Sequence, residues 1–96
     1  MRFVWDAAKT RANVAEHGIS FEQARELFLA NGSSLDIFDE RHSVDEDRFV
    51  SIGGTSAGLV VAVWTEPEDG IVRIISARLA TPREAALYRS FIEGAP

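Results

Sequence analysis

The sequence contains no cysteine, only one methionine, and no apolar run approaching the ~20 residues that a membrane span requires. The absence of cysteine excludes a disulfide, a thiolate metal site and a cysteine nucleophile. The first residues lack the long apolar core of a secretory signal, so we expect a cytoplasmic protein without membrane contacts. His17 and His42 stand alone, without the close spacing to a second ligand that zinc sites use. We therefore expect no metal and no cofactor.

What is present is the composition of one globular domain, which we expect to span residues 1–96. The chain is 46% hydrophobic and 26% charged. Its net charge of −5 argues against an RNA ligand, but the charge is unevenly distributed. Residues 36–47 hold six carboxylates and one arginine, which accounts for the whole net charge. Residues 71–96 hold four arginines and two glutamates, so a mildly basic face can coexist with an acidic one.

Hydrophobic periodicity predicts the element order β-α-α-β-β-β-β-α. The short connections between the later strands favour hairpins, and hence an antiparallel sheet of four to five strands. We expect an α+β fold, with the first two helices packed on the sheet and the last helix closing one end. The predicted strands are 2–5, 35–38, 48–53, 59–66 and 71–78, and the predicted helices are 7–16, 20–31 and 82–93.

Helix boundaries carry strong local signals. Asp6 is a good N-cap and Gly18 a good C-cap for the first helix, while Ser20 and Thr81 can each begin a capping box. Spacing predicts a narrow buried face on the first helix, made of Ala8, Ala12 and Ala15. The same reasoning predicts buried stripes of Phe21, Ala24, Leu27 and Phe28 on the second helix, and of Ala85, Tyr88, Phe91 and Ile92 on the last. The pair Gly53-Gly54 is followed by no helix and indicates a hairpin rather than a phosphate cradle.

The strand 71–78 places Arg73 and Arg78 among apolar residues. Each guanidinium must stay solvated, pair with a carboxylate, or bind an anion. Strand periodicity points the two side chains to opposite faces unless a bulge intervenes. Arginine, histidine and tyrosine together suit a metal-free cleavage of a phosphodiester, in which arginine stabilises charge on phosphorus and histidine or a carboxylate takes the proton of a ribose 2′-hydroxyl.

Taken in order, six short motifs make the chain similar to a BrnT-type toxin of a type II toxin–antitoxin system, from Phe3 to Tyr88. They are Trp5-Asp6-x-x-Lys9-x-x-x-Asn13, His17-Gly18-Ile19-Ser20-Phe21-x-x-Ala24, Asp39-x-x-His42-Ser43, Arg48-Phe49-x-x-Ile52-Gly53, Thr65-Glu66 and Arg73-Ile74-Ile75-Ser76-Ala77-Arg78. The resemblance implies a RelE-like fold and an endoribonuclease that cleaves RNA and arrests growth. It also implies a BrnA-type antitoxin that silences the toxin and supplies the DNA-binding part of a complex acting on its own operator.

The resemblance also suggests roles for individual residues. We expect Arg78 first and Arg73 second as catalytic candidates, together with His42 and Tyr88. Tyr88 fits a packed ring with its hydroxyl at the rim slightly better than a catalytic acid, and His42 can instead pair with Asp39 or Asp45. The expected RNA contacts are Lys9, His17 and Arg83, although Lys9 could instead pair with Asp6. Trp5 and Trp64 fit core positions or anchors for the antitoxin better than base-stacking platforms. Asn13 fits a local backbone cap.

Four positions depart from the pattern, because residues that are not basic stand where the family commonly has basic ones: Glu16, Leu59, Pro67 and Leu79. Basic residues hold RNA phosphates, so their loss bears on activity rather than on fold. Two hypotheses follow. The chain is an active, metal-independent endoribonuclease, or it is a weak or silent binding module that acts through its antitoxin complex.

Overall fold

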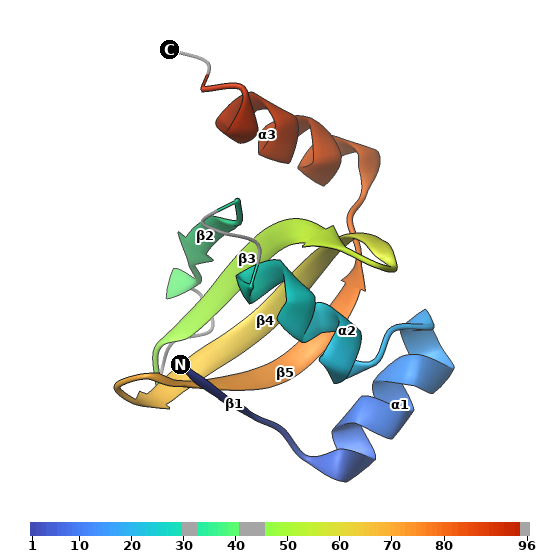
Figure 1. Ribbon diagram of the computed structural model, residues 1–96, viewed down its shortest axis with the longest axis vertical. Helices are drawn as coiled ribbons and strands as arrows, with labels where there is room; N and C mark the ends of the chain where they lie inside the picture. Colours follow the sequence, from blue (N-terminus) through green and yellow to red (C-terminus); the bar gives the residue numbers. More distant parts are fainter. Residues whose placement is uncertain (30–32, 41–45, 95–96) are drawn as a thin grey trace.

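The computed structural model describes residues 1–29, 33–40 and 46–94 (Figure 1). It confirms an α+β fold in the expected order of elements. Its strands are β1 (Arg2–Val4), β2 (Leu35–Phe38), β3 (Arg48–Thr55), β4 (Gly58–Glu68) and β5 (Ile71–Leu79). Its helices are α1 (Ala7–His17), α2 (Phe21–Arg25), the 3₁₀ turn η1 (Glu26–Phe28) and α3 (Pro82–Ile92). No helix in the described ranges is long and apolar enough to cross a membrane.

The sheet has five strands in the order β1-β5-β4-β3-β2. The pairs β3–β4 and β4–β5 are antiparallel, as their short connections predict, and β2–β3 is antiparallel as well. The expectation of a purely antiparallel sheet is wrong for β1, which lies parallel to β5 with Phe3 opposite Val72. Hairpin length constrains only strands that follow each other directly, and two helices and three strands separate β1 from β5. The sheet is therefore mixed.

The helix caps form as the sequence predicts. Asp6 accepts hydrogen bonds from the backbone N–H groups of Ala8 and Lys9, at 2.7 and 3.3 Å. Gly18 ends α1 in the left-handed conformation with φ of 73°. The capping boxes at Ser20 and at Thr81 are both complete. These local interactions set where α1, α2 and α3 begin.

The core lies between one face of the sheet and the segment of α2 and η1, and α2 lies across that face in Figure 1, whereas α1 lies along β5. Its fully buried members include Phe21, Ala24 and Leu27 from α2 and η1, while Phe28 is half-buried against them. The expected alanine face of α1 is wrong, because Ala8, Ala12 and Ala15 are all exposed and the buried residue of that helix is Asn13. Alanine spacing cannot reveal this, since one buried hydrogen-bonding side chain sets how α1 faces the sheet.

The last helix, α3, lies beyond one end of the sheet, as expected (Figure 1). Its predicted buried stripe is wrong. Ala85 and Tyr88 are half-buried, whereas Phe91 and Ile92 are 46% and 47% exposed. Among the described residues, α3 is joined to the rest of the fold by Glu84, which pairs with Arg78, and by Tyr88, which donates to the carbonyl of Ser33, so its last turn is left exposed. A helical repeat in the sequence reports which residues share a side, but not whether a partner surface exists.

Gly53 belongs to β3 rather than to a loop, and the β3–β4 turn falls at Ser56 and Ala57. A Cβ atom at Gly53 would lie 2.9 Å from the Cβ of Leu27. The glycine therefore lets η1 approach the sheet closely. The prediction of a hairpin in this region is confirmed, although its turn lies further along the chain.

Candidate functional site

A β-bulge in β5 places Arg73 and Arg78 on the same face of the sheet. Arg73 lies opposite Thr65 and Arg78 lies opposite Val61 on β4, where Trp64 pairs with Ile74 but Val63 pairs with Ser76. Ile75 is the extra residue. Without it the two arginines, five positions apart, would point to opposite faces. Val61 and Thr65 are four positions apart on β4, so both arginines point away from the face that α2 covers.

Arg48 shares this face, because it lies opposite Thr65 on the other side of β4. Directly opposed residues on neighbouring strands point to the same side of a sheet. We call this surface, with Arg48, Arg73 and Arg78, the arginine face. Thr65 sits in the row between Arg48 and Arg73 and is 1% exposed, and its hydroxyl has no hydrogen-bond partner among the described residues. Sequence reasoning missed Arg48, although it opens one of the six motifs.

Arg78 is held by a two-point ion pair with Glu84. Its Nη1 and Nη2 donate to the two carboxylate oxygens of Glu84 at 2.7 and 2.8 Å. Glu84 also accepts from the backbone N–H of Thr81 at 2.9 Å, so the same carboxylate caps α3. The hydrogen bonds from Arg78 are the main reason that the pKa of Glu84 falls from 4.5 to about 2. The pairing of strand arginines with carboxylates, left open by the sequence, is thus realised at Arg78.

Arg73 differs from Arg78 in its surroundings. Arg73 is exposed, and within the described ranges its guanidinium makes no hydrogen bond or ion pair to another side chain. An uncompensated guanidinium attracts an anion more strongly than one whose charge a carboxylate already balances. On this ground Arg73 is the stronger candidate for a phosphate contact, and Arg78 is the more rigidly held one.

Tyr88 extends from α3 toward the segment before β2. It is half-buried, and its hydroxyl donates a hydrogen bond of 2.7 Å to the backbone carbonyl of Ser33. That bond ties α3 to the chain on the β2 side. A role in proton transfer would require the hydroxyl to leave Ser33, so its catalytic assignment stays a prediction.

The two tryptophans are half-buried beside the core. The ring of Trp64 stacks on Phe49 with centroids 4.7 Å apart, and its Nε1–H donates to the Oγ of Ser51 at 2.8 Å. Ser51 in turn donates to Asp36 on β2 at 2.6 Å. Trp5 contacts Phe21 edge-on, with centroids 6.2 Å apart. These contacts fit packing of both tryptophans against the core. A role in binding the antitoxin stays a prediction.

The expected RNA contacts lie on two helices rather than on the strand that carries Arg73 and Arg78. Lys9 and His17 are exposed on α1, and Arg83 is exposed in the first turn of α3. The nearest carboxylate of His17 is that of Glu16, at 3.9 Å. His42 lies outside the described residues.

Asn13 makes a set of contacts that sequence reasoning missed, since it is not a local cap. Its amide donates to the carbonyl oxygens of Ile19 and Ala77, both at 2.8 Å, and accepts from the N–H of Ala77 at 3.2 Å. The side chain thus pairs with both backbone groups of Ala77, as a neighbouring strand would. Because β1 pairs with β5 only over residues 71–73, this amide covers part of the edge that β1 leaves open. It also holds the residue next to Arg78.

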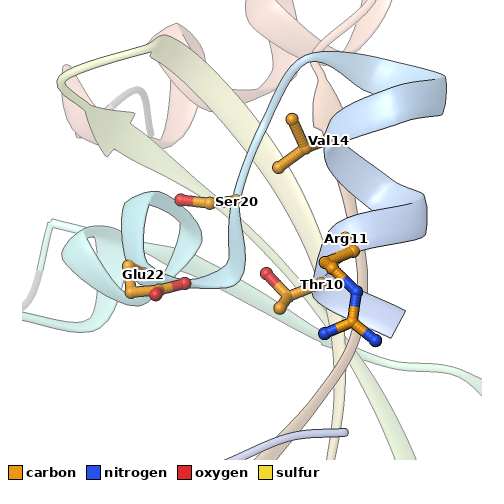
Figure 2. Close-up of a pocket in the computed structure, with 5 residues that line it drawn as sticks. All are labelled: Thr10, Arg11, Val14, Ser20 and Glu22. Carbon is orange, nitrogen blue, oxygen red and sulfur yellow. The ribbon is translucent and has the colours of Figure 1, made fainter. Parts of the chain in front are cut away.

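A shallow hollow of about 290 Å³ lies between α1 and the start of α2, away from the arginine face (Figure 2). Thr10, Arg11 and Val14 line it from α1, and Ser20 and Glu22 line it from the start of α2. The hydroxyl of Thr10 accepts a hydrogen bond from the N–H of Phe21, so part of this wall serves the helix junction. Among the described residues, no group of three or more histidines and carboxylates could hold a metal ion.

Comparisons with known proteins identify the family of the chain. A family model described as "Ribonuclease toxin, BrnT, of type II toxin-antitoxin system" matches residues 5–84. The chain belongs to the BrnT family. It is therefore a toxin component of a type II toxin–antitoxin system. The match begins at Trp5, spans the arginine face and ends at Glu84, so it includes both members of the Arg78–Glu84 pair.

The fold of this BrnT-family chain also matches a solved structure. The crystal structure of the Brucella abortus ribonuclease toxin, BrnT, superposes with a TM-score of 0.66 at 24% sequence identity. The match covers 84% of this chain and 97% of that one. Comparison with curated proteins finds no match. The structural likeness establishes the fold.

Proposed function

We propose that this BrnT-family toxin is a metal-independent endoribonuclease that cleaves RNA and arrests growth, and that a BrnA-type antitoxin silences it. The observation that carries the proposal is the bulge at Ile75, which brings Arg73 and Arg78 to one face of the sheet. Two guanidiniums on one side of a surface can contact neighbouring phosphate oxygens. The family description as a ribonuclease toxin supports the same reading.

The proposed reaction uses the ribose 2′-hydroxyl as nucleophile. The 2′-oxygen forms a bond to phosphorus while the bond from phosphorus to the 5′-oxygen breaks, leaving a cyclic phosphate and a 5′-hydroxyl. A base removes the 2′-proton and an acid supplies a proton to the departing oxygen. Arg73 and Arg78 would stabilise the added negative charge on the phosphate oxygens. His42 and Tyr88 stay the candidates for proton transfer, and Lys9, His17 and Arg83 for contacts with more distant phosphates.

Alanine variants of the two arginines test the assignment. Losing a preorganised charge partner of a developing oxyanion typically lowers the rate about 10²–10³-fold. We expect losses of this order for Arg73→Ala and Arg78→Ala in cleavage of a labelled RNA by purified protein. Arg11→Ala is the matched control, because it removes the same charge from the opposite, helical side. Full activity in a well-folded Arg73→Ala or Arg78→Ala protein would remove that residue from the mechanism. Loss of cleavage in EDTA, restored by a divalent ion, would refute the metal-free claim.

A silent binding module is the second candidate, and two observations favour it. Glu84 already balances the charge of Arg78, and the four departures from the family pattern remove basic side chains. Inducing this chain alone in bacteria separates the two functions, since an active toxin stops growth and a silent module leaves growth unchanged. The active function is the better supported, because Arg73 is uncompensated within the described chain.

The proposed antitoxin would cover the arginine face with carboxylates, because RNA must be excluded from it. We propose that operator DNA is bound only through the antitoxin part of the complex. A reading frame for a small DNA-binding protein beside this gene would support the pairing. Co-expression of that neighbour should restore growth, and failure to do so would argue against it as the antitoxin.

A further inference from the structure

The ion pair between Arg78 and Glu84 leaves one edge of the guanidinium free. Nη1 uses both of its hydrogens, one toward Glu84 at 2.7 Å and one toward the backbone carbonyl of Leu79 at 3.3 Å. Nη2 uses one hydrogen toward Glu84. An arginine has five N–H donors, so the second hydrogen of Nη2 and the hydrogen of Nε remain. Neither is bonded within the described chain, and the side chain is 43% exposed.

These two remaining donors form one edge of the planar group. Two parallel N–H groups on one edge are the arrangement that binds two oxygens of a phosphate at once. The opposite end of the group is fixed by the two oxygens of Glu84. The carboxylate therefore determines the direction in which the free edge points.

Glu84 is itself held in place. Its carboxylate accepts from Thr81 N–H at 2.9 Å, while the Thr81 hydroxyl accepts from Glu84 N–H at 3.2 Å. The capping box thus fixes the carboxylate relative to the start of α3, and the ion pair fixes the guanidinium relative to the carboxylate. The side chain of Glu84 is 25% exposed, so water competes only in part for these bonds.

We propose that Glu84 is a positioning residue for RNA cleavage, which holds Arg78 so that its Nε–Nη2 edge meets the reacting phosphodiester. This inference rests on the proposed ribonuclease function. Glu84 itself does not contact the RNA and acts on it only through Arg78. A misplacement of about 1 Å at a reacting centre can lower a rate about 100-fold. Releasing the guanidinium from Glu84 should therefore slow the chemical step.

Removing the charge of Glu84 should affect RNA binding and the cleavage rate in opposite directions. A carboxylate beside the phosphate site repels the RNA backbone, so removing its charge favours binding. Glu84→Gln keeps an acceptor for the capping box and removes the charge. We expect kcat to fall about tenfold or more, while the Kd for a non-cleavable 2′-deoxy oligonucleotide stays equal or decreases.

Three variants separate positioning from a structural role of the cap. Thr81→Ala removes the hydroxyl that accepts from the Glu84 N–H but keeps the Thr81 N–H that holds the Glu84 carboxylate. The Arg78–Glu84 pair therefore stays in place, and kcat should stay close to that of the wild type. Glu84→Gln should lower kcat as stated. In an Arg78→Ala background, Glu84→Gln should produce no further loss, because Glu84 acts through Arg78. Circular dichroism of each protein reports whether α3 is retained.

Several results would overturn the inference. A Glu84→Gln protein that cleaves as fast as the wild type would show that Glu84 does not position Arg78. Faster cleavage would show that Glu84 instead blocks Arg78 from the phosphate. Equal losses in Thr81→Ala and Glu84→Gln would assign the effect to the cap of α3. A further loss on top of Arg78→Ala would show a route that bypasses Arg78. Absence of cleavage by the wild-type chain would overturn the proposed function and this inference together, whereas the other outcomes leave the proposed function standing.

Discussion

Replacing Asn13 by alanine should be among the most destabilising single changes in α1. The side chain makes three hydrogen bonds to backbone groups, and it is 6% exposed. Asn13→Ala leaves the N–H and C=O of Ala77 and the C=O of Ile19 without these partners. Each buried polar group left unpaired costs about 1–3 kcal/mol. Allowing for some water entry at the edge of β5, we expect a loss of about 3–5 kcal/mol in the free energy of unfolding.

A loss of that size is large for a chain of this length. Domains of about 100 residues are stable by roughly 5–15 kcal/mol, and 1 kcal/mol corresponds to about 4–8 °C in Tm. Urea unfolding followed by tryptophan fluorescence gives the free energy directly, because Trp5 and Trp64 lie beside the core. Glu16→Ala, at an exposed position of the same helix, is the control and should change stability by less than about 0.5 kcal/mol.

A second substitution at Asn13 tests which of its hydrogen bonds matter. Asn13→Asp keeps an acceptor for the N–H of Ala77 but faces a carboxylate toward the carbonyl oxygens of Ile19 and Ala77. We expect a greater loss than for alanine near neutral pH. The loss should be smaller near pH ~4, because burial against two carbonyl oxygens raises the pKa of the new carboxyl group above that of an exposed aspartate and it is then protonated in the folded protein. If Asn13→Ala unfolds within about 0.5 kcal/mol of the wild type, the amide does not close the edge of β5 and this account of α1 fails.

Three further outcomes follow from contacts elsewhere. Gly53→Ala should destabilise the protein by about 1–3 kcal/mol, because the new Cβ is forced against Leu27. Gly54→Ala is the control and should have no such effect, because the space around its Cβ is open. Equal effects of the two substitutions in urea unfolding would contradict this. The pKa of Glu84 is lowered from 4.5 to about 2, chiefly by Arg78, so the pair stabilises fully above pH 4.5 and loses its effect as the pH falls toward 2. The stability difference between wild type and Glu84→Gln, about 1 kcal/mol after screening, should shrink over that window, and a constant difference would argue against the pair. The chain has a net charge of −5, so an acidic antitoxin gains little from long-range electrostatic attraction. Moderate salt should therefore weaken the complex only modestly. A steep loss of binding in a salt titration would show that charge pairing dominates.

Features that depend on neighbouring residues were predictable from the sequence. The caps at Asp6, Gly18, Ser20 and Thr81 form because each involves groups within a few positions along the chain. The β3–β4 and β4–β5 pairs form for the same reason, because short connections join their strands. The α+β class and the order of elements follow from these local signals together with hydrophobic periodicity.

Features that depend on distant partners were not predictable in this way. The parallel pairing of β1 with β5 joins Phe3 to Val72, and Asn13 reaches Ala77, 64 positions away. No periodicity links such positions, so the sequence pattern suggested an alanine face and a local cap instead. The apolar side of α3 was misread for a related reason, since its spacing is helical whether or not another surface covers it.

The candidate site depends on a single extra residue. A regular strand over residues 71–78 would send Arg73 and Arg78 to opposite faces, and the pairing with β4 shows where the regular alternation of faces breaks. A bulge adds one residue to one strand, so everything beyond it changes face. Once Ile75 takes that extra place, Ala77 faces the core and Arg78 joins Arg73 on the open side. The same shift brings Arg78 within reach of Glu84 at the start of α3, so one irregularity in β5 both assembles the arginine face and supplies the carboxylate that orients part of it.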